Sequence, residues 1–179
     1  VYFESPTIAV SGVAASPIVI RGYPGETATL DSGFPEFESA GSGAWELVDA
    51  ALGEYRSKRT ITGSRVYAYV TGIAGYANER VVLVPYKTAA AFRATTDQYN
   101  TTAFYVGPGT FIDTDQRVHI RLAKTADLRA AEARYGTVFG AETADPNQYP
   151  IVVSAALHTL RVTGSYLVFQ DLTFNQAQN

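Results

Sequence analysis

The chain has 179 residues, of which 46% are hydrophobic and 17% charged, with a formal net charge of −3. This balance excludes a disordered chain and predicts one packed domain, or one domain that carries a sizeable insertion. The charge disfavours a nucleic-acid partner, the longest apolar runs are too short for a membrane span, and the lack of Cys excludes disulfides and thiolate metal sites.

The opening segment predicts short strands that are joined by corners rather than by hairpins. Strands are expected within residues 1–10, 17–21 and 27–31. Pro17 stands at the first position of its strand, where its missing N–H does least harm. Pro24 and Gly25 then suit a type II turn.

Residues 34–149 have a different pattern, which predicts an inserted β-rich domain. Its strands have the spacing of an antiparallel sandwich, with a hairpin at its end and a helical turn or two within residues 88–95. A longer helix is expected at residues 125–135, with Thr125 as N-cap and Gly136 as the C-terminal stop. The expected strands are 44–48, 55–62, 65–70, 80–86, 110–113 and 117–122.

The closing segment, residues 150–179, repeats the pattern of the opening one. Strands are expected at 150–154, 160–163, 166–169 and 172–174. Only Gly164-Ser165 and Gln170-Asp171 separate the last three, which indicates bends within one coil of a parallel stack. Alternation then places one set inward, namely Leu160, Val162, Leu167, Phe169, Leu172 and Phe174, and another outward, namely Arg161, Thr163, Val168, Asp171 and Thr173.

The predicted fold class is therefore all-β. Residues 1–33 and 150–179 are expected to form coils of a right-handed parallel β-helix, and residues 34–149 to form an inserted antiparallel β-sandwich-like domain with one short helix near 125–135. The central expectation is that the opening and closing segments lie side by side and run parallel.

Three stretches carry a resemblance to a known superfamily. SGVAASPIVIRGYPGE (residues 11–26) and VTGSYLVFQDLTFNQA (residues 162–177) resemble coils of right-handed parallel β-helix proteins of the pectin-lyase-like superfamily. YVGPGTFIDTDQRVHIRL (residues 105–122) resembles an insertion in secreted bacterial β-helix proteins. The resemblance implies a secreted or cell-surface bacterial protein that binds or degrades polysaccharide, as a glycoside hydrolase or polysaccharide lyase. The alternative is a non-catalytic structural, filament or adhesion protein.

The resemblance also implies that catalytic groups lie on coils beyond Asn179, so no catalytic residue is assigned. Two coils bury too little apolar surface to be stable alone, and their edges would be open to pairing. We therefore expect the chain, which begins at Val1 and lacks Met, to be a processed product or part of a longer polypeptide. The rest of that polypeptide or a partner subunit would cover the open ends.

The candidate substrate-binding residues are Asp171, Arg161 and His158. Arg161 with His158 could hold an acidic sugar, because guanidinium groups bind carboxylates through two hydrogen bonds. Asp171 could belong to the same carbohydrate-binding face. The structural alternatives are a turn residue for Asp171, a solvated strand Arg and a loop His.

Three further sets of residues are interpreted as structural rather than functional. Asn175 is expected to stack in a ladder of side-chain amides at a coil corner, and contact with a substrate is the alternative. His119 and Arg121 are expected on the solvent-exposed face of a strand. Asp113 and Asp115 have the spacing of two calcium ligands, but the other ligands of a calcium loop are missing, so neither a metal nor a cofactor is expected.

Overall fold

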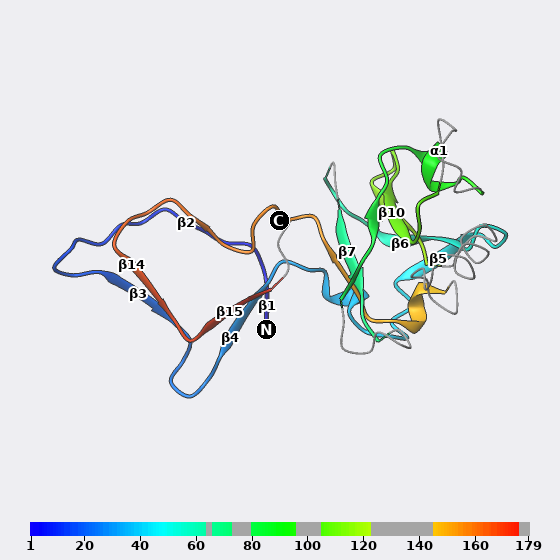
Figure 1. The fold of residues 1–179 in the computed structure, drawn as a ribbon. Coiled ribbons are helices and arrows are strands. Elements are labelled where there is room, and N and C mark those ends of the chain that lie inside the picture. The colour runs from blue at the N-terminus through cyan, green and yellow to red at the C-terminus, as the bar shows by residue number, and fades with distance from the viewer. Residues whose placement is uncertain (64–65, 73–79, 96–104, 123–144, 176–179) are drawn as a thin grey trace, which may run out of the picture. The chain divides into compact units, whose positions relative to one another are not determined.

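A computed structural model describes residues 1–63, 66–72, 80–95, 105–122 and 145–175 of the chain. The described part is mostly β-strand with one short α-helix, so the protein is all-β (Figure 1). The chain divides into two compact units. Val1–Phe34 and Ser154–Asn179 form the first, called here the parallel unit, and Pro35–Val153 form the second, called the inserted unit.

The parallel unit is built from short strands at both ends of the chain. Each of the last three strands of the closing segment pairs in parallel with one strand of the opening segment: β13 with β2, β14 with β3, and β15 with β4. The expectation that Ile18–Arg21 runs parallel beside the closing segment is therefore confirmed. The strands are β1 (Tyr2–Phe3), β2 (Thr7–Ile8), β3 (Ile18–Arg21), β4 (Ala28–Asp31), β13 (Arg161–Val162), β14 (Leu167–Gln170) and β15 (Leu172–Asn175).

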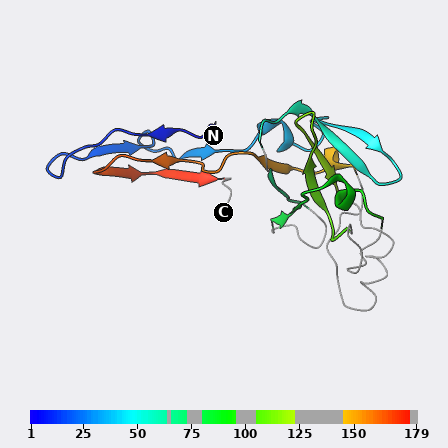
Figure 2. The same cartoon turned by 90° about the horizontal axis from the view of Figure 1, so that it is seen from above.

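The pairing keeps chemically similar residues next to each other. Ile18 lies beside Leu167, Ile20 beside Phe169, and Ala28 beside Leu172. The strand β4 also pairs with β1 on its other edge, so the order of this sheet is β1-β4-β15. Figure 2 shows the blue strands of the opening segment lying over the orange and red strands of the closing one.

Close backbone contacts at the bends explain the small residues there. A Cβ on Gly12 would lie 2.8 Å from both the Ile18 nitrogen and the Tyr166 oxygen, and a Cβ on Gly164 would collide with the Val10 carbonyl. Asp171 bends the chain between β14 and β15 with a φ of 53°. Asp tolerates this left-handed conformation better than most residues, because its short side chain bonds locally.

The interior of the parallel unit is only half-buried. Leu167, Phe169 and Leu172 are half-buried as expected of inward residues, but Val162 and Phe174 are 42% and 43% exposed. The fully buried residues of the unit, within the described chain, are glycine or polar. Asp31 is one of them and accepts a hydrogen bond from the Gly33 N–H at 2.7 Å.

The inserted unit holds two sheets, and one of them is mixed. The order β5-β6-β11-β10-β9 is antiparallel except for β10 and β9, which run parallel. The prediction of an antiparallel domain was wrong at this pair. The elements are β5 (Trp45–Asp49), β6 (Glu54–Thr60), β7 (Tyr67–Val70), β8 (Val81–Val82), β9 (Val84–Pro85), α1 (Ala89–Phe92), β10 (Gly109–Ile112), β11 (Arg117–Arg121) and β12 (Ile151–Ser154), with 3₁₀ turns at Pro35–Phe37 and Pro146–Gln148.

The length of the connection between β9 and β10 explains why these two strands can run parallel. It spans residues 86–108 and includes α1, and a crossover of this length permits parallel neighbours. The helical turn predicted within 88–95 is confirmed as α1, and Thr88 caps it by accepting a hydrogen bond from the Ala91 N–H. The predicted hairpin is confirmed as β10 and β11, and the predicted helix at 125–135 lies outside the described residues.

The strand β12 was assigned by sequence to the coils, but it lies in the sheet β12-β7-β8 of the inserted unit. All four of its residues are buried, so both of its faces are covered, which a half-exposed coil strand would not allow. Among the described residues, every buried apolar side chain lies between Phe37 and Val153. None of the described helices has the length and apolar character that crossing a bilayer requires.

Candidate functional site

A buried carboxylate organises the best-defined polar site of the inserted unit. Glu54 begins β6 and is 1% exposed. The Arg93 guanidinium donates to it through Nε at 2.9 Å and through Nη2 at 2.8 Å, one bond to each carboxylate oxygen. On its other side, His119 Nδ1 lies 2.6 Å from Glu54 Oε1. A buried acid that is paired in this way remains ionised.

The pKa of Glu54 reflects opposing influences. Burial is the largest and by itself would raise the pKa, but the hydrogen bonds from Arg93 and His119 together outweigh it and hold the pKa below its usual value. With Glu54 ionised, the His119 Nδ1–H is held as a donor to it. The Nε2 atom of the same ring then faces away from Glu54.

Two aspartates of the β10–β11 turn lie next to that Nε2 atom. Asp113 Oδ2 is 3.7 Å from His119 Nε2. One ligand atom each from Asp113, Asp115 and His119 lie within 4.8 Å of one another. We call Glu54, Arg93, Asp113, Asp115 and His119 the acid–histidine cluster.

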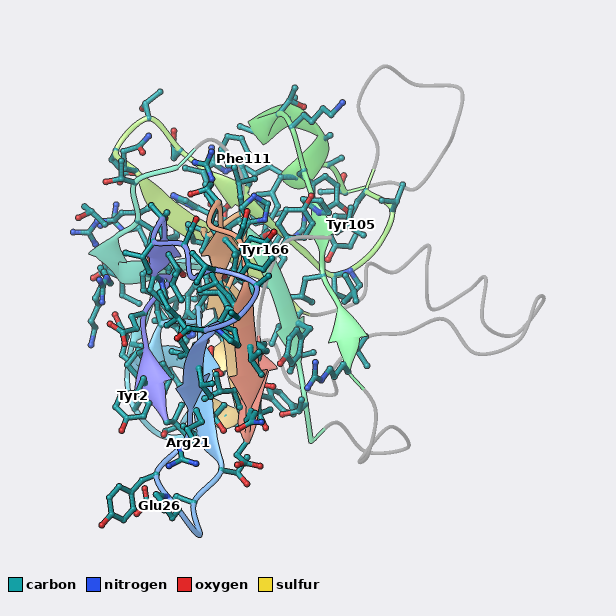
Figure 3. The ribbon with its side chains drawn as sticks, turned by 90° about the vertical axis from the view of Figure 1, so that its left-hand side faces the viewer. Tyr2, Arg21, Glu26, Tyr105, Phe111 and Tyr166 are labelled. Atoms are coloured by element: carbon teal, nitrogen blue, oxygen red, sulfur yellow. The ribbon has the colours of Figure 1, made fainter. Side chains whose placement is uncertain are left out.

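Apolar aromatic side chains pack beside the acid–histidine cluster. The ring centroids of Phe92 and Phe111 lie 6.5 and 6.3 Å from that of His119, and Phe111 is labelled in Figure 3. This packing, on the central strand of the sheet, explains why His119 is only 3% exposed. The low polarity of these aromatic side chains strengthens the Glu54–His119 interaction.

The prediction that His119 and Arg121 lie on a solvent-exposed face was wrong, because both are buried. Arg121 is also 3% exposed. Its guanidinium donates to the carbonyls of Leu52, Phe92 and Ala94, and it lies 4.1 Å above the centre of the Tyr105 ring. The side chains of β11 are thus buried on both faces, because aromatic residues and backbone carbonyls cover the polar one.

The sequence-predicted substrate residues lie in the parallel unit and are all exposed. Arg161 is on β13, His158 precedes that strand, and Asp171 forms the bend between β14 and β15. Within the described residues, no side-chain hydrogen bond or ion pair joins these three. The backbone of Asp171 instead lies close to that of Glu26, with Gly22 between them. A Cβ on Gly22 would lie 2.8 Å from the backbone carbonyl oxygens of both residues.

Sequence reasoning missed Glu54 and Arg93, and it assigned His119 a solvent-exposed place. The only local signal was the alternation of charged and apolar residues in β11, which a half-exposed strand shares. The decisive contact is between strands: β11 pairs with β6 so that Arg121 lies opposite Glu54 and His119 opposite Arg56. Nothing in either segment alone predicts that register.

The residue beside Asn175 is not the second amide that the expected ladder requires. Asn175 lies in register with Asp31 on β4, and its carbonyl oxygen accepts from the Thr159 hydroxyl at 2.6 Å. The residue one strand away is therefore a carboxylate rather than a second amide.

No protein-family model matches the chain, and the searches of curated proteins and of solved structures likewise found no significant match.

Proposed function

We propose that the parallel unit forms successive turns of a right-handed parallel β-helix of the pectin-lyase-like kind, in a secreted or cell-surface protein that binds acidic polysaccharide. The observation that carries the proposal is the triple parallel pairing of β2, β3 and β4 with β13, β14 and β15. Three strands in one chain order pair in the same order with three others, which is the relation between two turns of a coil.

The outward residues of these strands form short rows. Arg21 lies beside Gln170, Thr29 beside Thr173, and Thr7 beside Arg161. Neighbouring strands are about 4.8 Å apart. A row of polar side chains at this spacing suits an extended polymer that repeats its own hydroxyl and carboxylate groups.

Two arginines favour an acidic polymer. Arg21 and Arg161 are exposed, and neither has a carboxylate within ion-pair distance among the described residues. A guanidinium group binds a carboxylate through two parallel hydrogen bonds, so each arginine offers an unused site for a uronate. Figure 3 shows Arg21 at the end of its strand and Glu26 in the turn that follows. The exposed Tyr23 and Tyr166 add aromatic surface on which sugar rings can stack.

A binding assay tests the proposal directly. The full chain is run through gels that contain polygalacturonate or a neutral glucan, and we expect retardation by the acidic polymer alone. Arg21→Ala combined with Arg161→Ala should weaken binding at least tenfold, since two charge-assisted contacts are lost. Lys58→Ala combined with Arg59→Ala removes the same two charges from the inserted unit and should leave binding unchanged. Equal retardation of the double variant and the native chain would contradict the proposal.

A non-catalytic structural or adhesion role is the second candidate, and the acids of the parallel unit favour it. Asp31 is buried and bonded to backbone, while Glu26 and Asp171 lie at an exposed bend. Glycoside hydrolysis needs two carboxylates that flank the scissile bond. Assays for new reducing ends and for unsaturated products distinguish a hydrolase, a lyase and a protein that only binds.

A further inference from the structure

In the β10–β11 turn, the hydrogen bonds of Asp113 and Asp115 among the described residues all go to one carboxylate oxygen of each. Asp113 Oδ1 accepts from the Thr114 N–H at 2.6 Å and from the Thr114 hydroxyl at 3.3 Å, and Asp115 Oδ1 accepts from the Arg117 N–H at 3.1 Å. These bonds fix both carboxylates. In the described part of the chain, neither Oδ2 atom accepts a hydrogen bond.

His119 Nε2 is the second observation at the same place. The side chain is 4% exposed, and Nε2 is buried without a hydrogen-bond partner among the described residues. A buried polar atom without a partner loses its hydrogen bonds to water and gains none in return, which destabilises the folded protein. Such an atom in a native protein therefore calls for a specific explanation, and a ligand that the atom binds is one.

We propose that His119 Nε2, Asp113 Oδ2 and Asp115 Oδ2 bind a divalent transition-metal ion such as Zn²⁺. One imidazole nitrogen and two carboxylate oxygens are donors that such ions accept. Ligand atoms about 2.0–2.1 Å from a tetrahedral Zn²⁺ lie roughly 3.3 Å from one another. One ligand atom from each of the three residues lies within 4.8 Å of the others, and His119 Nε2 is 3.7 Å from Asp113 Oδ2.

Glu54 supplies the outer contact that a metal-binding imidazole needs. A ligating histidine usually donates its second N–H to a carboxylate or a carbonyl, which fixes the tautomer and orients the ring. Glu54 accepts from His119 Nδ1 at 2.6 Å, and Arg93 holds Glu54 in place. The buried pair thus presents the Nε2 lone pair towards the two aspartates.

The surrounding charges allow a cation to bind. Arg93, Arg56 and Arg117 lie 3.7–4.0 Å from the Oδ2 atoms, beyond hydrogen-bond distance. Each already has a closer acid partner, because Glu54 binds Arg93 and Glu46 binds the other two at 2.6 and 2.8 Å. The neighbourhood then holds four carboxylates against three guanidinium groups, so the local field still favours a cation.

The donor set selects the class of ion. Ca²⁺ and Mg²⁺ prefer all-oxygen sites with six or more ligands, whereas an imidazole suits Zn²⁺ and its neighbours in the first transition series. Three protein ligands leave a coordination position for water, as in catalytic rather than structural zinc sites. The site lies in the inserted unit and does not depend on polysaccharide binding by the parallel unit.

Titration calorimetry of the metal-free full chain with Zn²⁺ tests this proposal. We expect one equivalent to bind, and binding to weaken at least tenfold in Asp115→Asn and in Asp113→Asn. Both variants keep the Oδ1 acceptor of the turn and replace only Oδ2, so they should fold normally. Ca²⁺ should bind more weakly than Zn²⁺.

The histidines provide the matched control, because the chain has only His119 and His158. His158→Gln should bind Zn²⁺ as the native chain does, whereas His119→Gln should not. In NMR spectra, Zn²⁺ should shift the imidazole signals that disappear in His119→Gln. Loss of binding in His158→Gln, native affinity in Asp115→Asn, tighter Ca²⁺ binding or no Zn²⁺ binding at all would each overturn the proposal.

Discussion

The two units reach order by opposite routes. In the inserted unit, apolar side chains such as Tyr105, Phe92 and Ile120 are fully buried, and even charged groups are enclosed and paired. In the parallel unit, the apolar side chains are half-buried or exposed, and regularity comes from strands repeated side by side. The comparison teaches that parallel stacking gives a register without a closed core. It also predicts that the most destabilising substitutions remove a partner of a buried charge in the inserted unit and crowd a close backbone contact in the parallel unit.

The largest effect is expected where charge is enclosed. Glu54→Ala leaves Arg93 and His119 without their shared partner and should lower the free energy of unfolding by roughly 3–5 kcal/mol. Urea denaturation of the full chain measures this change. Glu36→Gln, which breaks an exposed ion pair with Arg59, is the control and should cost less than about 1 kcal/mol. If the two variants prove equally stable, the enclosed charges do not stabilise the inserted unit in the way described above.

The next effect is expected at a bend of the parallel unit. Gly164→Ala places a methyl group against the Val10 carbonyl and should destabilise the unit by about 1–3 kcal/mol. Hydrogen exchange should then speed up in β3 and β14 but remain slow in β6 and β11. Ser165→Ala, at the adjacent exposed residue, should change neither set. Faster exchange in both units would show that they do not unfold separately.

Alkaline pH should act on the inserted unit. Burial raises the pKa of Tyr86 to about 12, although hydrogen bonds with Val106 and Gly107 partly oppose this shift. Because the pKa is raised, the folded state keeps a proton that the unfolded state loses above about pH 10. Stability is therefore intact below that pH and should fall, by the order of 1–2 kcal/mol, as the pH approaches 12.

Tyr86→Phe checks the assignment of this alkaline loss. The variant should be less stable at neutral pH, since two hydrogen bonds are lost, but its stability should fall less steeply with alkaline pH. Tyr105, whose pKa burial also raises, accounts for part of the remaining slope. An unchanged slope in urea midpoints measured across this range would rule out Tyr86 as a contributor.

The smallest effect is expected at the bend between β14 and β15. Asp171 has a φ of 53°, a conformation that glycine adopts without strain. Asp171→Gly should therefore change the free energy of unfolding by less than about 1 kcal/mol. Thermal denaturation measures it, and Asp31→Gly, which removes a buried acceptor, is the sensitive comparison. A large loss in Asp171→Gly would mean that its carboxylate has a structural role.

Local chemistry made parts of the fold predictable. The Gly164-Ser165 and Gln170-Asp171 bends, the Thr88 cap and the turn at residues 114–116 each fix the chain within a few residues, so the strands around them could be placed. The parallel partners of β3 and β4 could be inferred because their apolar alternation matches that of the closing segment.

The rest depended on long-range pairing. The parallel contact of β9 with β10 follows from the path of a crossover, which no short pattern encodes. The site depended on register in the same way: Glu54 and His119 meet because β6 and β11 pair, and Asp113 joins them because the turn between β10 and β11 bends towards the ring. A strand such as β11, whose charged face is buried, has the same alternation of apolar and charged residues as a strand whose charged face is exposed to solvent.

The pairing of Ser32 with Ser154 has a consequence for how the protein is made. The hydroxyl of Ser154 donates to the Ser32 carbonyl at 2.9 Å, and the two hydroxyls are 3.2 Å apart, so the chain leaves and rejoins the parallel unit at one point. Forming β3–β14 contacts before residues 35–153 have folded would require closing a very long flexible loop, which is entropically costly. The ribosome also delivers the closing strands after residues 35–153. Assembly should therefore begin in residues 35–153 and finish with the pairing of the strands on either side of them, as the two serines meet.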